Sequence, residues 1–203
     1  MTTTRDAFPE VLPTVSTRYC FSCGADAVSS QKSGDVTKYL CATCGVVSDR
    51  FLTWDPILKA TFDANNRLVH YGGGAFVRNP EGKFLLIRQA KFPFLWTIPG
   101  GHLEVGEDPK LCALREVQEE TSLIMTDMTM LFEGVLEGDS CVGGADVHFW
   151  YLYLGTAKGT VVTQDAEVTG SRWVSLSEID TTTITYPLQF FLANDSVRKI
   201  LEA

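Results

Sequence analysis

One short segment limits the fold of this chain more than any other. Asp108 followed by Pro109 is typical of the start of a helix, because Asp caps the first amides and proline fits the first turn. The pattern predicts a helix over about residues 109–121. Three glutamates lie on that helix at relative positions 0, +3 and +4: Glu116, Glu119 and Glu120. This spacing places the three carboxylates on one helical face.

A helical face with three carboxylates needs a positive partner. Like charges at this spacing repel one another, and Arg115 can pair with only some of them. Mg²⁺ prefers oxygen ligands and commonly combines one or two carboxylates with water and substrate phosphates. The face therefore predicts a divalent-metal site, and Leu111, Leu114 and Val117 are expected to anchor the helix to a core. The alternative is a solvated helix face that is rich in charge.

The segment that begins at Gly101 resembles the Nudix box, which is written G-x5-E-x7-R-E-U-x-E-E-x-G-U with U a bulky aliphatic residue. The matching positions are Gly101, Glu107, Arg115, Glu116, Val117, Glu119, Glu120 and Leu123. One position departs, because Ser122 stands where the pattern has glycine. That glycine would end the helix in a left-handed conformation, so serine either costs about 1 kcal/mol or ends the helix differently.

The resemblance implies a fold, a metal and a set of site residues. The implied fold is of the α/β class, an α/β/α sandwich with a mixed β-sheet. The implied metal is Mg²⁺ or Mn²⁺, held by the three glutamates, with the Gly101 carbonyl as a further ligand. Glu107 and Arg115 are expected to form an ion pair that braces loop against helix. The catalytic set that follows is Glu107, Arg115, Glu116, Glu119, Glu120 and Glu167.

Glu167 belongs to this set by a looser argument. Nudix domains often carry a glutamate in a loop shortly before a strand that contains tryptophan, and Glu167 lies six residues before Trp173. It is expected to be an additional metal ligand or the general base. The alternative is an exposed loop carboxylate.

Four of the six cysteines form two Cys-x2-Cys pairs that are 17 residues apart: Cys20, Cys23, Cys41 and Cys44. This spacing predicts a four-thiolate zinc ribbon, because tetrahedral Zn²⁺ takes four thiolates and leaves no open position. Gly24 and Gly45 follow the pairs and allow tight turns that point amides at the sulfurs. So short a segment buries too little surface to fold alone, and zinc is expected to supply folding energy.

We expect four parts along the chain. They are a flexible N-terminus at 1–17, the zinc ribbon at 18–50, a connector at 51–66 and a Nudix hydrolase domain at 67–203. Within the last part, strands are predicted at 68–77, 83–89, 129–137, 146–154 and 172–176, and a closing helix at 187–201. The strand at 146–154 has no clearly polar face, so both of its faces are expected to be covered.

The remaining aromatic and histidine residues are interpreted mainly as core or packing residues. Phe92, Phe94 and Trp96 could form a wall against a nucleobase, but a place in the core is favoured. The histidines show no metal-ligand spacing and are interpreted as polar or packing residues, and the two other cysteines stand alone. These residues are His70, His102, His148, Cys112 and Cys141.

Composition restricts the partners. The net charge is −8, and residues 18–50 carry a net charge of only +1, so nucleic acid is a disfavoured ligand. No run of apolar residues is long enough for a membrane span, and the first 17 residues lack a signal-peptide pattern. We expect a cytoplasmic protein with a small-molecule nucleotide substrate, no membrane partner, and a homodimer as one state that the chain can adopt.

The expected activity is Mg²⁺-dependent hydrolysis of a phosphoanhydride in a nucleoside diphosphate linked to another moiety, such as ADP-ribose, NADH or a nucleotide sugar. A ribbon before a Nudix domain is similar to the NADH pyrophosphatases, but their downstream Ser-Gln-Pro-Trp-Pro-Phe-Pro run is absent. The proline typical of ADP-ribose pyrophosphatases is replaced by Asp139. The alternatives are a nucleoside triphosphate pyrophosphatase, a non-catalytic nucleotide-sensing module and an RNA-cap-processing enzyme.

Overall fold

The computed structural model of the chain describes residues 3–34, 36–91, 94–163 and 167–203. These residues pack into two compact units. The first unit consists of Met1–Tyr71, Glu104–Gly106 and Val135–Phe149. The second unit consists of Gly72–Leu103, Glu107–Gly134 and Trp150–Ala203.

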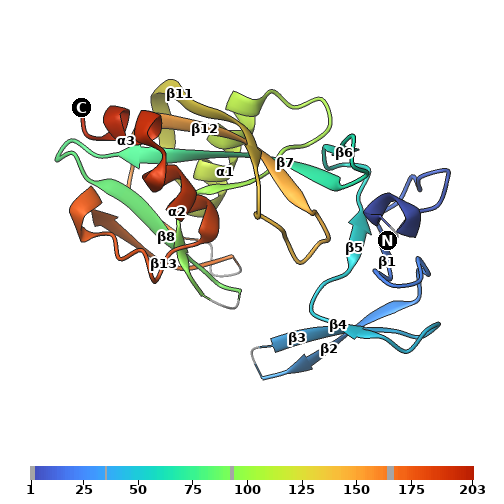
Figure 1. The fold of residues 1–203 in the computed structure, drawn as a ribbon. Helices are drawn as coiled ribbons and strands as arrows, with labels where there is room; N and C mark the ends of the chain where they lie inside the picture. The colour runs from blue at the N-terminus through green and yellow to red at the C-terminus, as the bar shows by residue number, and fades with distance from the viewer. Residues whose placement is uncertain (1–2, 35, 92–93, 164–166) are drawn as a thin grey trace. The chain divides into compact units, whose positions relative to one another are not determined.

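The first unit is built from short strands. Its elements are the 3-10 helix η1 (Thr4–Ala7), β1 (Thr17–Tyr19), β2 (Val28–Ser33), β3 (Val36–Cys41), β4 (Val47–Ser48), β5 (Leu52–Trp54), β6 (Ala60–Phe62) and the first residues of β7 (Leu68–Arg78). Strands β2, β3 and β4 form one antiparallel sheet, β1 pairs with β5, and β6 pairs with β7 (Figure 1). A small core joins β1, β5 and β7, because Phe8, Tyr19, Leu52 and Leu68 are buried against one another.

The second unit carries the larger sheet and the α-helices. Its elements are the rest of β7, β8 (Phe84–Gln89), β9 (Trp96–Thr97), β10 (Gly100–His102), α1 (Pro109–Thr121), most of β11 (Ile124–Leu136) and β12 (Val147–Lys158), β13 (Val168–Val174), the 3-10 helix η2 (Leu176–Glu178), α2 (Tyr186–Ala193) and α3 (Asp195–Leu201). The strand order is β11-β12-β7-β8-β13, with β10 paired to β7 and β9 to β8. The predicted α/β fold with a mixed sheet is confirmed (Figure 1).

Helices cover both faces of this sheet. Ala113 and Val117 of α1 are fully buried in a cluster that includes Tyr153 of β12. On the other face, Trp150 of β12 meets the ring of Phe191 in α2 at 5.8 Å. Alternate residues of β12 therefore contact different helices, and the prediction that both of its faces are covered is confirmed.

Several element boundaries differ from the sequence predictions. The predicted closing helix at 187–201 is two separate helices, α2 and α3. The Asn194 side chain accepts hydrogen bonds from the amides of Ser196 and Val197 and so caps the start of α3. Strand β11 begins at Ile124 rather than near 129, and β13 begins at Val168 rather than at 172. Leu111, a predicted anchor of α1, is 57% exposed. The buried face of α1 is rotated toward Cys112 and Ala113 instead.

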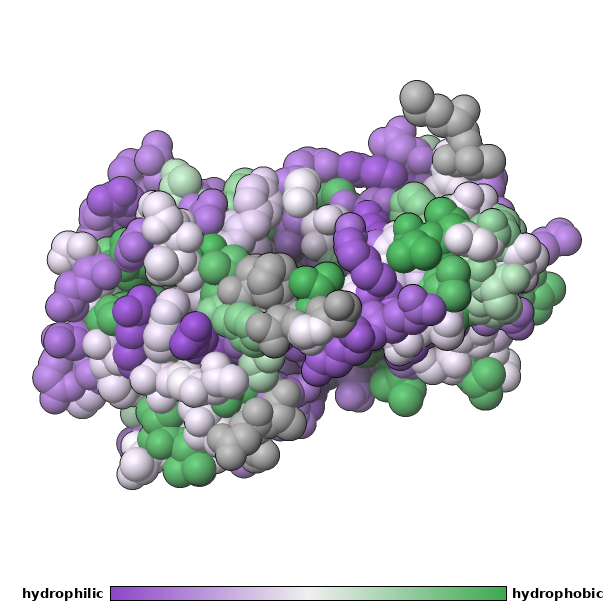
Figure 2. Space-filling model, turned by 90° about the horizontal axis from the view of Figure 1, so that it is seen from below, coloured by the Kyte–Doolittle hydropathy of each residue, from purple (hydrophilic) through white to green (hydrophobic). Residues whose placement is uncertain are grey.

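The four-part division of the chain stays a prediction, because compact packing does not by itself define segments that fold independently or move. Among the described residues, no helix is long and apolar enough to cross a membrane. On the face shown in Figure 2, hydrophobic residues lie interspersed with hydrophilic ones.

Candidate functional site

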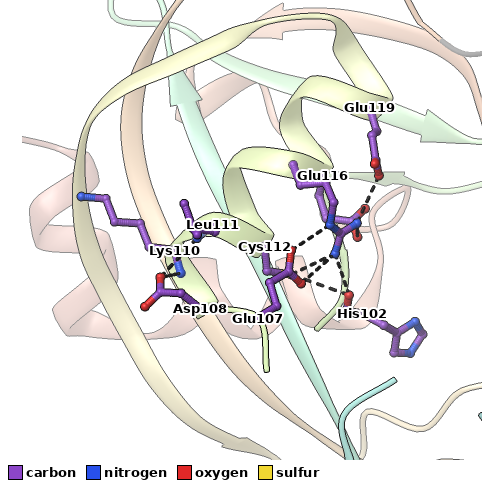
Figure 3. Close-up of polar contacts among 9 residues, drawn as sticks. His102, Glu107, Asp108, Lys110, Leu111, Cys112, Glu116 and Glu119 are labelled. Carbon is purple, nitrogen blue, oxygen red and sulfur yellow. Dashed lines mark hydrogen bonds and ion pairs between the residues drawn. The ribbon is translucent and has the colours of Figure 1, made fainter. Parts of the chain in front are cut away.

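Helix α1 begins where the sequence predicts. The Asp108 carboxylate accepts hydrogen bonds from the amides of Lys110 at 2.9 Å and Leu111 at 3.3 Å (Figure 3). The helix ends at Thr121, and Ser122 takes a left-handed conformation with φ 60° and ψ 12°. Serine therefore adopts the backbone conformation for which the Nudix pattern has glycine.

The guanidinium of Arg115 donates hydrogen bonds to four residues around this helix, which are labelled in Figure 3: His102, Glu107, Glu116 and Glu119. Both oxygens of Glu107 accept hydrogen bonds from it, at 2.8 and 3.0 Å. It also donates to Glu116 at 2.6 Å, to Glu119 at 3.1 Å and to the His102 carbonyl at 3.1 Å. The ion pair expected between Glu107 and Arg115 is present, and it connects the loop before the helix to the middle of the helix.

Glu116 lies directly against the backbone of Gly101. Only 9% of Glu116 is exposed, and a Cβ at Gly101 would lie 2.5 Å from its carboxyl carbon. No side chain other than hydrogen fits at position 101 unless the carboxylate moves. Burial raises the pKa of Glu116, although the neighbouring Arg115 works against this rise.

Glu120 reaches the other glycine of β10. Its carboxylate accepts a hydrogen bond from the Gly100 amide at 2.9 Å. Burial raises the pKa of Glu120 to about 8, the Gly100 amide opposes this rise, and the carboxylates of Glu116 and Glu167 add to it. Glu167 therefore lies close enough to Glu120 to interact electrostatically, and it is exposed. Its role as a metal ligand or general base stays a prediction.

The glutamates are not all equally close to one another. Within the described part of the chain, no three of the glutamates have carboxylate oxygens that all lie within 4.8 Å of one another. Arg115 holds Glu116 and Glu119, whereas the Gly100 amide holds Glu120. The Glu119 side chain is 58% exposed.

These donors nevertheless fit a hard divalent cation. All are oxygens. Burial, and after it the repulsion of neighbouring carboxylates, raises the pKa of Glu120. The Glu116 carboxylate occupies the place that a side chain at Gly101 would take. Such a set is typical of Mg²⁺ or Mn²⁺ ligation.

The two Cys-x2-Cys turns of the first unit share one geometry. The Gly24 amide donates to the Cys20 carbonyl and the Gly45 amide to the Cys41 carbonyl, both at 2.9 Å. Both glycines are left-handed, with φ of 69° and 74°. The Ser22 amide points at the sulfur of Cys20, at 3.3 Å. The turns thus direct backbone amides toward sulfur, as predicted.

The four sulfurs converge. Cys20 Sγ lies 3.6 Å from Cys44 Sγ, and Cys23 Sγ lies 3.7 Å from Cys41 Sγ. Tetrahedral zinc with bonds of about 2.3 Å separates its sulfurs by about 3.8 Å. The amides of Cys44 and Thr43 lower the pKa of the Cys41 thiol to about 6. The Ala25 amide opposes the shift at Cys23, but hydrogen bonds with the other thiols raise its pKa to about 12. The donor set therefore fits Zn²⁺.

One further group of ligand-type side chains had no signal in the sequence. The structure brings His70, Cys141 and His148 of the first unit together, with ligand atoms within 4.8 Å of one another. His70 is remote in sequence from the other two, so no short spacing could reveal the group. Both histidines are buried, as packing residues are, and the proximity of Cys141 is an additional feature.

Two further features of the second unit are the aromatic residues near Trp96 and a cavity beside α2 and α3. Trp96 is partly exposed and carries the Arg172 guanidinium over its ring at 4.2 Å, and Phe92 lies outside the described residues. A cavity of about 580 Å³ lies beside α2 and α3, where Gln189 and Arg198 are among its lining residues. None of the candidate site residues lines it.

A mixed sheet between helices, with a glutamate helix packed on a Gly-Gly strand, defines a fold class that comparison with known proteins identifies. The chain belongs to the NUDIX domain family, whose family model matches residues 69–192.

Individual relatives match shorter stretches. The m7GpppN-mRNA hydrolase NUDT17 of Xenopus laevis is 37% identical over 79 residues, which cover 37% of this chain and 27% of the relative. The ADP-ribose pyrophosphatase of Bacillus subtilis is 41% identical over 54 residues, which cover 25% of this chain and 29% of the relative. The chain thus spans less than a third of the length of these two relatives.

Solved structures share the fold. The crystal structure of a MutT NUDIX hydrolase from Burkholderia pseudomallei superimposes with a TM-score of 0.54 at 18% identity, and the match covers 65% of this chain and 98% of that chain.

Proposed function

We propose that the chain is a Nudix hydrolase that uses Mg²⁺ or Mn²⁺ to cleave a phosphoanhydride bond in a small nucleotide. The observation that carries this proposal is the contact between the buried Glu116 carboxylate and Gly101, beside Glu120 on the Gly100 amide. Carboxylates that are costly to bury beside one another indicate a cationic ligand.

Each residue has a part in this proposal. Glu116, Glu119 and Glu120 hold the divalent ions, and the Gly101 carbonyl is an additional ligand. Arg115 and Glu107 position the glutamate face. Glu167 is the general base or a further ligand. Bound divalent cations would neutralise phosphate oxygens and acidify the attacking water.

The four cysteines are proposed to bind one structural Zn²⁺. Their convergence and the amides that point at sulfur support this assignment. Four thiolates complete a tetrahedral shell, so this ion would stabilise the first unit without taking part in hydrolysis.

The substrate is proposed as a nucleoside diphosphate linked to a second moiety. The names of the two relatives support a shared chemistry, because both ADP-ribose and the m7Gppp cap contain phosphoanhydride bonds. A nucleoside triphosphate and an RNA cap are therefore alternatives within the same reaction class. The net charge of −8 makes a small nucleotide a better match than RNA.

The test is a substrate panel with Mg²⁺ in which products are identified by mass. The panel comprises ADP-ribose, NADH, nucleotide sugars, dinucleoside polyphosphates, nucleoside triphosphates and a capped RNA. Glu116→Gln and Glu120→Gln should lower kcat at least a hundredfold while the thermal unfolding curve stays cooperative. The exposed Glu133→Gln is the matched control and should leave kcat unchanged. Full activity of both site variants at saturating Mg²⁺ would contradict the proposal.

A further inference from the structure

Three side chains of the types that bind transition metals converge in the first unit, apart from the four cysteines. His70 lies on β7, Cys141 lies in the segment between β11 and β12, and His148 lies on β12. Their ligand atoms lie within 4.8 Å of one another. His70 is 4% exposed and His148 is 7% exposed, while Cys141 is half-buried. Buried imidazoles beside a thiol form a potential ligand set rather than a chance surface grouping.

The individual distances are close to those of a coordination shell. Cys141 Sγ lies 3.8 Å from His70 Nδ1, and the rings of His70 and His148 meet edge-on at 5.9 Å. Zinc bonds of about 2.0–2.3 Å place neighbouring ligand atoms about 3.3–3.8 Å apart. Small side-chain rotations would therefore bring the three ligand atoms to one ion.

Asp139 orients His148 in the way that metal-binding histidines are commonly oriented. Nδ1 of His148 lies 2.9 Å from the Asp139 carbonyl and 3.2 Å from its carboxylate. A carbonyl oxygen can only accept, so Nδ1 carries the hydrogen. A metal-binding histidine usually donates its other ring N–H to such an oxygen, and the opposite nitrogen then binds the metal. Nε2 of His148 is thus the nitrogen that a metal would take.

We propose that His70, Cys141 and His148 bind a second zinc ion. Imidazole and thiolate ligands suit Zn²⁺ and disfavour Mg²⁺ and Ca²⁺, which prefer oxygen. The three residues supply three of the four ligands of tetrahedral zinc.

The ion would fasten the segment between β11 and β12. The backbone of this segment already docks on β5, where the Thr53 amide donates to the Gly143 carbonyl at 2.8 Å. The Asp146 carboxylate accepts from the Leu68 amide, also at 2.8 Å. A zinc bond to Cys141 would add a third attachment, to β7 and β12 through the histidines.

Zinc stoichiometry tests the proposal. The full chain is loaded with Zn²⁺ and dialysed against buffer with excess Mg²⁺, which occupies the glutamates, and zinc per chain is measured by atomic emission. Two equivalents are expected for the natural sequence and one for Cys141→Ser, which keeps the side-chain size. The exposed neighbour Ser140→Ala is the matched control and should keep two equivalents. Circular dichroism and thermal unfolding verify that the Cys141 and Ser140 variants are folded.

Further variants distinguish this ion from the zinc of the four cysteines and from zinc bound non-specifically. Cys23→Ser should also lower the count by one, and the double variant Cys23→Ser/Cys141→Ser should retain none. Asp139→Asn should weaken the second ion 10- to 100-fold in competition with a chelator. A single equivalent in the natural sequence, two equivalents in Cys141→Ser, or binding of Cu²⁺ without Zn²⁺ would overturn the assignment. In the first two cases His148 and Asp139 serve as a buried ion pair alone.

Discussion

At the scale of single residues, the contact between Gly101 and Glu116 links the fold most directly to the proposed chemistry. A Cβ at position 101 would lie 2.5 Å from the Glu116 carboxyl carbon. Gly101→Ala should therefore displace that carboxylate and lower kcat at least tenfold. The midpoint of thermal unfolding should fall less than in Arg115→Lys, because Arg115 keeps both hydrogen bonds to Glu107. Steady-state kinetics at several Mg²⁺ concentrations measure the effect.

Gly170→Ala is the matched control for this prediction. Gly170 lies on β13 and has an ordinary φ, and an added Cβ would meet Trp96 only at 4.0 Å. Its kcat should remain that of the natural sequence. Equal activity of both alanine variants would show that the fit at position 101 does not matter for hydrolysis.

Arg115 is a second residue whose geometry cannot be replaced by charge alone. Its planar guanidinium donates to both oxygens of Glu107 and to Glu116 at once. Lysine offers a point charge without this fork. Arg115→Lys should lower the free energy of unfolding by about 2 kcal/mol in urea titration, since partly buried carboxylates lose their donors.

The exposed pair of Arg198 with Glu202 supplies the comparison. Both side chains are more than half exposed, so Arg198→Lys should change the free energy of unfolding by less than about 0.5 kcal/mol. If both lysine variants changed the free energy of unfolding equally little, the hydrogen bonds of Arg115 would not stabilise the fold.

At the scale of elements, the end of α1 has a backbone conformation that its residue does not favour. Ser122 is left-handed, although its hydroxyl gains a hydrogen bond to the Val162 carbonyl at 3.2 Å. Ser122→Gly should raise the free energy of unfolding by about 0.5 kcal/mol, and Ser122→Val should lower it by more than about 1 kcal/mol. Urea unfolding of both variants tests this order. If the valine variant were more stable than the natural sequence, the left-handed conformation at position 122 would not be strained.

The turn between β6 and β7 gives a prediction about pH. Burial works against ionisation of Asp63, but the amides of Arg67 and Asn65 and the Arg67 guanidinium hold its pKa below the usual 3.8. A lowered pKa in the folded state stabilises the protein above the unfolded pKa, and this stabilisation is lost as the pH falls through the folded pKa. Asp63→Asn should therefore cost about 1–2 kcal/mol at pH 7 and progressively less below about pH 4.

Urea titrations at pH 7, 5 and 3.5 measure this difference, with the exposed Glu81→Gln as the control. A stability difference that stays constant across these pH values would show that the Asp63 carboxylate is not preferentially ionised in the folded state.

How far the sequence predicts each element depends on whether its determinants are local. Helix α1 follows from Asp108 and Pro109, which act within one turn of their own position. The break between α2 and α3 also has a local cause in Asn194, but the hydrophobic pattern continues through it and hides it. The early starts of β11 and β13 depend on pairing with distant strands, which no local pattern contains.

The same distinction holds for the sites. Glu116, Glu119 and Glu120 are neighbours on one helix, and each cysteine pair lies within one turn, so spacing alone identifies them. His70 and Cys141 come together only because the segment before β12 folds back toward β7. The contact of Glu116 with Gly101 likewise depends on how α1 packs on β10.

At the scale of the whole molecule, the proposed metals divide into two chemical kinds with separate consequences. Thiolate and imidazole ligands hold Zn²⁺ tightly, and structural zinc contributes to folding itself, by about 10–16 kcal/mol in zinc-finger peptides. Carboxylates bind Mg²⁺ more weakly, together with substrate phosphates. Zinc should therefore control the order of the cysteine turns, and Mg²⁺ should control hydrolysis.

Hydrogen exchange separates the two roles. Removal of zinc by a strong chelator, or Cys23→Ser, should abolish amide protection in β2, β3 and β4, and added Mg²⁺ should not restore it. Removal of Mg²⁺ alone should stop hydrolysis and leave that protection unchanged. Because β3 ends at Cys41, its amides lie next to the proposed ion and report on it directly. Protection of β3 that survives complete loss of zinc would mean that the strands are held by their own pairing, and the four cysteines would then have no role in folding.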